Sequence, residues 1–382
     1  MVPVSYNYRN LLVRWKTTLM TASGFTLVVA ALVVMLAFIN GIQTVCATSG
    51  EPENVLVLAK GNNDEVLSQL ERDVVAQVES SKEVAVDSGG QTLASRELYM
   101  VVNHFNEKAQ QHEFLQVRGV LPVAPKVHTQ VRIVDGRLFH PSQSEVTIGR
   151  AVQREQGLAV GDVVAIGRKP WKVAGVFEAG GAAFESEVWC DLNELASQFH
   201  REGVYSSVVL RAADAEAAAG LAGRLAASPR LSVDAQTEPL YYAKQGEETR
   251  VLQSAAWMIA WFMGVGAVFG VMNTMFAAIG QRIKDIAVMR IMGYASVEIL
   301  LSFLLEAVLI SLIGGGLGLG LGYLTNGLTR STAVGARQIE FAFRVDGQIL
   351  LLAGLFTIGM GILGGLLPAL SAMRIKPLEA LR

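Results

Sequence analysis

The chain has 382 residues, of which 51% are hydrophobic and 17% are charged, and its mean hydropathy is +0.38. This composition is too apolar for an ordinary soluble protein and too polar for a protein that lies wholly within a membrane. The formal net charge of −2 provides no general attraction to nucleic acid.

Four long runs carry almost no charge and predict transmembrane helices at 19–42, 253–280, 297–325 and 348–372. Each run can cross a hydrocarbon core of about 30 Å at about 1.5 Å per residue. The first run follows a basic start and precedes Val45-Cys46-Ala47, which resembles a signal-peptide cleavage site. Because its apolar stretch is longer than a usual signal core, we expect a retained span.

Basic residues predict which side of the membrane each segment faces. They cluster before the first run, between the second and third, and after the fourth, at Arg9, Arg14, Lys16, Arg282, Lys284, Arg290, Arg374, Lys376 and Arg382. By the positive-inside rule, segments 1–18, 281–296 and 373–382 are cytoplasmic. The external loop at 326–347 contains Arg330, Arg337 and Arg344, which is weaker evidence than three agreeing flanks. We expect a multi-pass protein of the inner membrane with both termini in the cytoplasm.

Residues 43–252 lie between the first two spans and predict a large periplasmic domain of mixed α and β structure. Its first part predicts strands at 55–58, 97–102 and 114–120. Asn63 or Asp64 can cap a helix, whose apolar stripe is Leu67, Leu70, Val74 and Val78. Pro122 and Pro125 then interrupt the pattern, which suggests a subdomain boundary near 122–126.

The second part of this domain predicts strands at 131–134, 145–148, 163–166, 171–177 and 206–210, with helices at 151–156, 191–199 and 214–227. The polar segment Tyr241–Gln253 is expected to continue as a helix into the second span and to form a stalk. Aspartates and glutamates are spread over the domain, most simply as a solvated surface. Cys46 and Cys190 are both expected on the oxidising side, but one pair does not make a disulfide framework.

A short polar stretch, Gln281–Tyr294, separates the second and third spans. Ile283, Ile286 and Ile291 have near-helical spacing, and Gly293 stands where a helix would stop. We interpret the stretch as an amphipathic helix along the inner membrane face, whose charged residues, Arg282, Lys284, Asp285 and Arg290, face the cytoplasm. A solvated connector with anchoring charges is the alternative.

The third and fourth spans contain two further signals. Helical spacing places Gly314, Gly318 and Gly322 on one face, and Gly361 and Gly365 repeat the pattern. Such faces let helix backbones approach closely, either within one chain or at a dimer seam. The second signal is the carboxyl of Glu306, which is costly inside a span. The carboxyl is expected to be protonated or to form a hydrogen bond with Ser302. Its role is structural or coupling, or it belongs to a proton relay.

Motifs for catalysis and cofactor binding are missing from the printed sequence. There is no Gly-x-x-x-x-Gly-Lys-Ser/Thr loop for ATP, no histidine pair with metal-ligand spacing and no Gly-x-Ser-x-Gly elbow. We therefore expect no catalytic, cofactor-binding or metal-binding residues in this chain.

Four regions of the chain, in order, resemble the FtsX-like permeases of ABC systems, the group that includes the macrolide exporter MacB, the lipoprotein-releasing permeases and FtsX. The first is the entry to the first span, with Asn10-Leu11, Arg14, Lys16, Thr18 and Leu19. The second resembles a MacB-type periplasmic domain, with Val117-Arg-Gly-Val120, Gly136-Arg137, Ile148-Gly-Arg150, Gly157, Gly161-Asp162 and 173–176. The others are 282–293 and a C-terminal signature at Pro368-Ala369, Ala372, Pro377 and Glu379–Arg382. Asp285, Ala287 and Ile291 depart mildly from the family pattern.

The resemblance implies an α-helical membrane protein with four transmembrane helices and a mixed α/β domain inserted between helices 1 and 2. It implies a permease that relays motion from a separate cytoplasmic ABC ATPase, which binds ATP and Mg²⁺, to the periplasmic domain. The coupling residues would be Arg282, Lys284, Asp285, Ile286, Arg290 and Gly293.

The resemblance also implies partners, namely a second copy or related permease and an adaptor protein in some systems. Export or extraction from the outer leaflet or periplasm is the first function expected. The alternative is an FtsX-like regulator of a cell-wall hydrolase, but external domains of that type are smaller. The sequence does not name the substrate.

Overall fold

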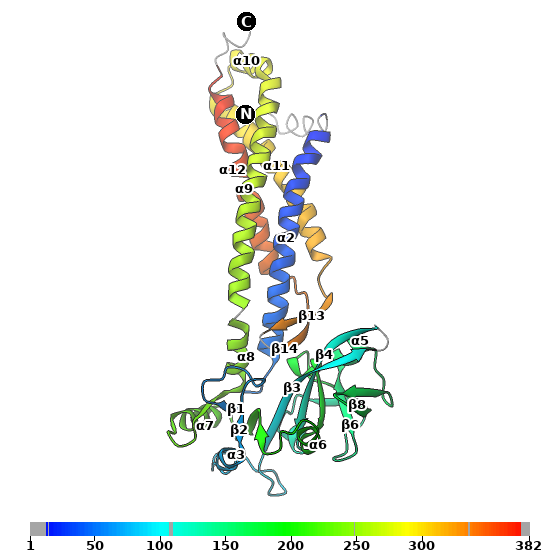
Figure 1. Cartoon of the computed structure of the whole chain (residues 1–382). Helices are drawn as coiled ribbons and strands as arrows, with labels where there is room; N and C mark the ends of the chain where they lie inside the picture. The colour runs from blue at the N-terminus through cyan, green and yellow to red at the C-terminus, as the bar shows by residue number, and fades with distance from the viewer. Residues whose placement is uncertain (1–12, 14, 107–109, 248, 335–336, 376–382) are drawn as a thin grey trace. The chain divides into compact units, whose positions relative to one another are not determined.

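The apolar runs and the charged segments separate into two units in the computed structural model, which describes residues 13, 15–106, 110–247, 249–334 and 337–375. The helical unit comprises the described residues within 1–41, 250–328 and 342–382. The α/β unit comprises those within 42–249 and 329–341. Figure 1 shows both units, and each is described by itself below.

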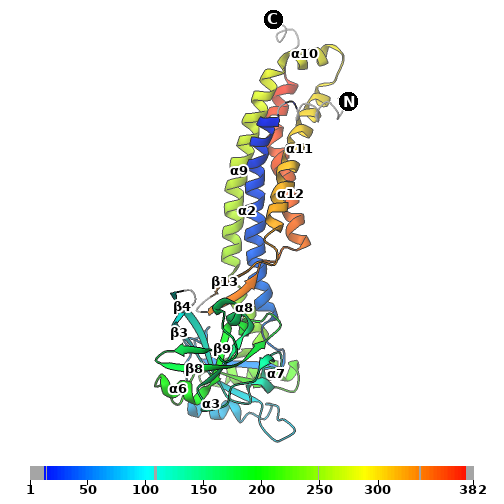
Figure 2. The same cartoon turned by 90° about the vertical axis from the view of Figure 1, so that its right-hand side faces the viewer.

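The predicted spans coincide with four helices that are long and apolar enough to cross a membrane: α2 (Trp15–Thr48), α9 (Thr249–Gln281), α11 (Ser296–Tyr323) and α12 (Gly347–Met373). The short helix α10 (Ile283–Ile291) connects α9 to α11. Within the helical unit the long helices run alongside one another (Figures 1 and 2). Their buried side chains, such as Phe25, Phe303 and Ile349, form one core.

The glycines of α11 allow close packing against α2. A Cβ atom added at Gly314 would lie 2.3 Å from the backbone oxygen of Ala22, and one at Gly318 would lie 2.7 Å from that of Thr26. The Thr26 hydroxyl donates a hydrogen bond to the Gly314 carbonyl at 3.0 Å. At Gly322 the same space is taken by Val33. This face therefore packs within one chain, one of the two arrangements expected for it.

A second glycine seam joins α11 to α12. A Cβ at Gly361 would meet the Ser311 side chain at 2.2 Å, and one at Gly365 would meet the Cβ of Ala307 at 2.5 Å. By contrast, a Cβ at Gly320 on α11 would meet no described atom within 4 Å. Only some faces of the glycine-rich helices are thus occupied by neighbouring helices of the same chain.

The α/β unit is built on one mixed sheet, ten-stranded within the described residues, in the order β12-β1-β11-β3-β4-β9-β6-β8-β5, with β7 paired to β8. The β4–β9 and β6–β8 pairs are parallel and the other pairs are antiparallel. The strands are β1 (Asn54–Ala59), β3 (Ala94–Asn106), β4 (Gln111–Val120), β5 (Arg132–Gly136), β6 (Glu145–Gly149), β7 (Val163–Ile166), β8 (Lys169–Glu178), β9 (Glu187–Asp191), β11 (Ser207–Arg211) and β12 (Val233–Thr237).

Short helices pack around this sheet, and a separate two-stranded pair joins β2 (Leu70–Glu71) to β10 (Val204–Tyr205). The helices are α3 (Arg72–Glu79), α4 (Ala124–Val127), α5 (Arg150–Gln156), the 3-10 turn η1 (Ala183–Ser186), α6 (Leu192–Gln198), α7 (Ala215–Ala227) and α8 (Glu238–Glu247). One continuous core extends from Val55 to Trp171 and Val233. The subdomain boundary predicted near 122–126 is therefore wrong, because the two prolines lie beside and within α4 and do not divide the core.

Two other local predictions for this unit differ from the structure. The helix expected from Asn63 or Asp64 begins only at Arg72, because the Asp64 carboxylate caps a turn by accepting from the backbone N–H of Val66. Leu67, expected on its buried stripe, is 70% exposed. Strands β9 and β12 were not predicted at all.

The external loop between the third and fourth spans also forms unpredicted strands, β13 (Thr329–Val334) and β14 (Arg337–Ala342), and its residues 329–341 belong to the α/β unit. The backbone N–H of Glu340 donates to the Ser186 hydroxyl at 2.9 Å, and its carboxylate pairs with Arg154 at 3.2 Å. The Gln116 amide donates to the carbonyl of Gln338. This hairpin therefore docks on the α/β unit rather than forming a free loop.

Three predictions fall on residues outside the described ranges. The predicted stalk appears as α8 and the start of α9, but Glu248, where the two would join, lies outside the described residues. The same holds for the N-terminal motif before Val13 and for the C-terminal signature at 377–382.

The glycine seams lead to a first prediction. Gly318→Leu should force α11 away from α2, because the added side chain would overlap the α2 backbone, and overpacking of this kind typically costs about 1–3 kcal/mol. The melting temperature of the purified chain in detergent should fall. Gly320→Leu makes the same change on the open face and should leave the melting temperature unchanged. Equal melting temperatures for both variants would contradict the seam.

Candidate functional site

The helix α10 has a mixed surface. Ile286 and Ala287 are fully buried against the rest of the helical unit. Lys284 and Asp285 are exposed charges. Several apolar side chains are also exposed, by 38% to 65%: Ile283, Val288, Ile291 and Met292. A short helix that exposes both charged and apolar groups is suited to bind another protein surface.

The helix ends at Gly293 for a conformational reason. Gly293 has φ +95°, which L side chains rarely adopt, so glycine is favoured there. The backbone N–H of Gly293 donates to the carbonyl of Arg290, and that of Tyr294 donates to the carbonyl of Met289. The predicted stop is therefore where the helix ends, and the turn sets the direction in which α11 begins.

Two of the charges assigned to the exposed face of α10 lie elsewhere. Arg282 is only 6% exposed, and its guanidinium donates to the carboxylate of Glu306 at 3.2 and 3.5 Å. Arg290 is half-buried and donates to the Ser296 hydroxyl. The expectation that both face the solvent was wrong, because a carboxylate within an apolar helix is stabilised by a nearby cation and draws Arg282 inward. Lys284 and Asp285 remain as the exposed charges.

The most extensive polar cluster lies within the α/β unit, around Arg118 of β4. Its side chain is 1% exposed and pairs with three carboxylates: Glu65 at 2.8 Å, Glu97 at 2.6 Å and Glu187 at 2.6 Å. The Tyr99 ring lies below the guanidinium at 4.8 Å, which adds a cation–π contact. We call this set, with His128 and Glu238, the buried charge network.

Strand register brings these groups together. Tyr99 of β3 and Trp189 of β9 stand directly opposite Arg118 on the neighbouring strands. Glu97 and Glu187 lie two residues from those partners, so the alternation of side chains places them on the same face of the sheet. The Trp189 indole N–H donates to the Glu187 carboxylate at 3.1 Å. The network is thus fixed by the pairing of three strands.

His128 extends the network to helix α8. Its Nε2 lies 2.8 Å from a Glu97 oxygen, and its Nδ1 lies 3.7 Å from a Glu238 oxygen. Glu238 is the first residue of α8 and also accepts hydrogen bonds from the Asn54 amide and the Glu51 backbone N–H, both at 3.0 Å. His128 therefore connects the sheet to the helix that precedes α9 in the chain.

Charges within the network shift the pKa values in opposite directions. Burial alone would raise the pKa of Glu97, but the neighbouring His128 and Arg118 outweigh it and lower the pKa to about 2. Burial alone would lower the pKa of His128, but Glu97 and Glu238 outweigh it and raise this pKa. Burial raises the pKa of Glu238. His128 is thus favoured as an imidazolium between two carboxyl groups.

The sequence analysis missed this network, because it interpreted the acidic residues of the domain as a solvated surface. Glu65, Glu97, Glu187 and Glu238 are instead buried. The available signal was Arg118 itself, an arginine inside an otherwise apolar strand segment. Among the described residues no group of three or more histidine, cysteine or acidic side chains is arranged to hold a metal ion. Cys46 and Cys190 are both buried, and they do not form a disulfide with each other.

Comparison with family models gives two matches. A MacB-like periplasmic core domain matches residues 18–228, and an FtsX-like permease C-terminal domain matches residues 257–377. Together they cover the α/β unit up to Ser228 and most of the helical unit.

Similar proteins carry related names. The chain is 25% identical to the macrolide export ATP-binding/permease protein MacB of Hahella chejuensis, over 95% of this chain and 57% of that protein. It is 29% identical to MacB 2 of Aeromonas hydrophila, over 71% of this chain and 42% of that protein. It is 30% identical to the uncharacterized ABC transporter permease YknZ of Bacillus subtilis, over 58% of this chain and 57% of that protein. The chain thus spans about half the length of these relatives.

Two solved structures align with the chain. The periplasmic region of MacB from Actinobacillus actinomycetemcomitans aligns with 53% of this chain and 94% of that one, at 12% identity and a TM-score of 0.39. The extracellular domain of YknZ, described as a noncanonic ABC-type transporter from Gram-positive bacteria, aligns with 48% of this chain and 100% of that one, at 15% identity and a TM-score of 0.36.

The buried charge network leads to a prediction about pH. Because the pKa values of His128 and Glu238 are raised in the folded state, their contribution to stability is present at low pH and is lost as the pH rises through the folded values. For His128 the loss begins above its usual pKa of 6.5. Raising the pH toward 9 should therefore loosen α8 from the sheet.

Two native cysteines can measure this loosening. The site of a Cβ on Gly246 of α8 lies 3.7 Å from the Cys46 sulfur, so α8 covers Cys46, whereas Cys190 lies inside the sheet. The alkylation rate of Cys46 is divided by the rate in unfolded protein at the same pH, which corrects for thiol ionisation. This ratio should rise with pH, while Cys190 stays protected. His128→Gln should reduce this pH dependence to the part that Glu238 contributes. If Cys46 reactivity does not change with pH, or if Cys190 becomes reactive in parallel, His128 and Glu238 do not hold α8 on the sheet in a pH-dependent way.

Proposed function

Because the chain belongs to the FtsX-like permeases that carry a MacB-like periplasmic core domain, we propose that it is the membrane-spanning subunit of an ABC transport complex. In this proposal a separate cytoplasmic ATPase binds and hydrolyses ATP, and the permease relays the resulting motion to its extracytoplasmic domain. The transported substrate is exported or extracted from the outer leaflet or the periplasm.

The surface of α10 is the observation that carries this proposal. Its exposed apolar residues Ile291 and Met292 adjoin the exposed charges Lys284 and Asp285 on a helix anchored by buried Ile286. Apolar anchors surrounded by charges are typical of a helix that binds in a groove of a partner protein. The charges would set the register and the rate of docking, and the apolar side chains would supply the affinity.

Placement of the ATPase in a second subunit is supported by the names of the relatives. The MacB relatives are named ATP-binding/permease proteins, whereas the YknZ relative is named a permease. ATP and Mg²⁺ would accordingly be bound by the partner. A second permease copy, or a related permease, would complete the membrane part, and an adaptor protein would extend an export system.

The proposal places both termini and α10 in the cytoplasm and the α/β unit in the periplasm, across the inner membrane. The basic flanks support this orientation. Transport is favoured over regulation of a cell-wall hydrolase, because the MacB-like core domain model matches residues 18–228. Macrolide export is part of the names of the relatives. We assign no substrate to this chain.

Orientation can be tested with single cysteines in intact cells. Both native cysteines are buried, so they contribute little background. A membrane-impermeant thiol reagent should label a cysteine that replaces Leu67, which is 70% exposed in the α/β unit. It should reach one that replaces the exposed Lys284 only after the inner membrane is opened. The opposite labelling pattern would reverse the assigned orientation.

Docking of the ATPase to α10 gives a further prediction. Ile291→Asp places a charge at an apolar anchor, and the loss of a well-buried interface residue typically costs about 2 kcal/mol or more. Copurification of the partner ATPase should fall about 30-fold at this cost. Leu67→Asp is the matched control, an exposed apolar residue in the α/β unit, and should leave binding unchanged. Wild-type recovery of the ATPase with Ile291→Asp would refute docking at α10.

A further inference from the structure

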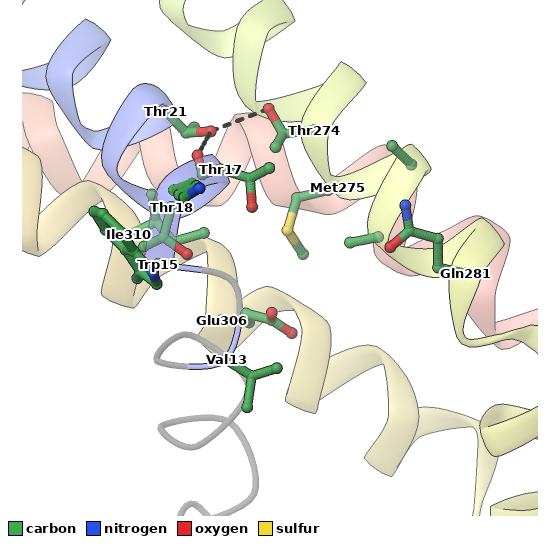
Figure 3. Close-up of a pocket in the computed structure, with 13 residues that line it drawn as sticks. Val13, Trp15, Thr17, Thr18, Thr21, Thr274, Met275, Gln281, Glu306 and Ile310 are labelled. Carbon is green, nitrogen blue, oxygen red and sulfur yellow. Dashed lines mark hydrogen bonds between the residues drawn. The ribbon is translucent and has the colours of Figure 1, made fainter.

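A cavity with both polar and apolar walls lies within the helical unit where α2 begins and α9 ends. It has a volume of about 310 Å³, or on the order of ten water volumes. Figure 3 shows that Thr17 and Thr21 of α2, Thr274 and Met275 of α9, and Glu306 of α11 surround it. Lys16 also lines it. A cation, several hydroxyl groups and a buried carboxylate thus meet in one space among helices that are otherwise apolar.

An apolar groove of about 460 Å³ extends from this cavity between α2 and α9. The cavity and the groove share Thr17, Thr21 and Thr274 in their walls. The Thr21 hydroxyl donates to that of Thr274 at 3.1 Å, which joins the two helices at the boundary (Figure 3). Beyond this hydrogen bond the groove walls are formed by apolar residues and glycine.

Glycine is what keeps the groove open. Gly24 on α2 and Gly266 and Gly270 on α9 line it, and a Cβ added at any of the three would meet no described atom within 4 Å. The seam glycines Gly314 and Gly318 differ, because their added Cβ atoms would overlap a neighbouring backbone. The groove is therefore a space that no described part of this chain fills.

The cavity lies at the expected level of lipid headgroups. The exposed Trp15 stands at the start of α2, and Gln281 stands at the end of α9. Tryptophan is enriched at the membrane–water interface. A pocket at this level that contains Lys16 and Glu306, continued by an apolar groove along two spans, is suited to an amphiphile with a headgroup and an acyl chain.

We propose that the cavity and the groove form one binding site for a phospholipid with a primary-amine headgroup, phosphatidylethanolamine, taken from the leaflet on the α10 side. The Lys16 ammonium group donates to its phosphate. The ammonium group donates to the carboxylate of Glu306, which also accepts from Arg282. An acyl chain lies in the glycine-walled groove. This inference goes beyond the proposed function, because it assigns a ligand that is neither the transported substrate nor ATP.

Headgroup contacts must supply the selectivity of this site. An acyl chain that enters the groove exchanges the apolar interior of the bilayer for apolar groove walls and gains little free energy. The groove alone would therefore accept any lipid. An anionic phosphatidylglycerol offers phosphate but no donor cation for Glu306. Phosphatidylcholine offers a cation whose nitrogen carries no hydrogen. A second copy of the chain would fill the groove with a helix but would bring no phosphate to Lys16.

Native mass spectrometry of the full chain tests the proposal. The chain is released from micelles that contain equal amounts of phosphatidylethanolamine, phosphatidylglycerol and phosphatidylcholine with the same acyl chains. We expect one phosphatidylethanolamine to be retained in preference to the others. Gly270→Leu should lower its retention about tenfold, because the new side chain occupies the groove without overlapping the chain. Gly316→Leu is the matched control, since a Cβ there also meets open space but outside the groove.

Three results would overturn the site. The first is equal retention of the three lipids, which would refute headgroup recognition. The second is unchanged lipid retention in Gly270→Leu. If this variant retains the lipid but no longer forms a dimer, the groove belongs to a second copy of the chain. The third is displacement of the lipid by water-soluble glycerophosphoethanolamine, which would show that the acyl chain does not contribute. The melting temperatures of the two variants should match, so that misfolding does not imitate the expected loss.

Discussion

One buried guanidinium organises the α/β unit. Arg118 holds three carboxylates in an interior from which water is excluded, and each of them would be strongly unfavourable alone. Since these carboxylates come from β3, β9 and the segment before β2, the strands must pair in one register for the charges to be neutralised. A one-residue slip of one of these strands would turn its side chains to the other face of the sheet and leave a buried carboxylate unpaired. The network therefore specifies the fold of the sheet as well as connecting it to α8.

The same physical rule explains why sequence reasoning succeeded for some parts and failed for others. Hydropathy identified the spans, because one-dimensional composition determines whether a helix can cross a membrane. Alternation identified most strands, but β9 was missed because Glu187 and Asp191 flank its apolar centre. Glu187 is buried only because Arg118, distant in sequence, neutralises it. The local sequence pattern does not show which distant residue neutralises a charge. In the same way, the inward orientation of Arg282 depends on Glu306.

Glycine spacing shows a similar limit of sequence reasoning. The pattern in α11 and α12 predicted that helices approach closely, and this is found at Gly314, Gly318 and Gly365. It could not show which glycines are covered by the same chain, since Gly316 and Gly320 repeat with the same spacing and face open space. Nor did the spacing single out Gly266 and Gly270 as the walls of a groove. A glycine face predicts that another helix or a ligand can approach closely. Only the packed structure shows which one does.

The helix α9 differs from its neighbours in how it is held. In the second candidate span, 22% of the most apolar stretch is buried, compared with 50% in the first and 39% in the third and fourth. Side-chain packing along its length therefore contributes least to fixing its position. Polar contacts hold it at two points: Thr274 bonds to α2 within it, and Arg282 pairs with Glu306 directly after it. Hydrogen bonds and ion pairs are directional and few, so they can exchange partners in discrete steps. Under the proposed function, the helix held by such contacts is the one suited to move.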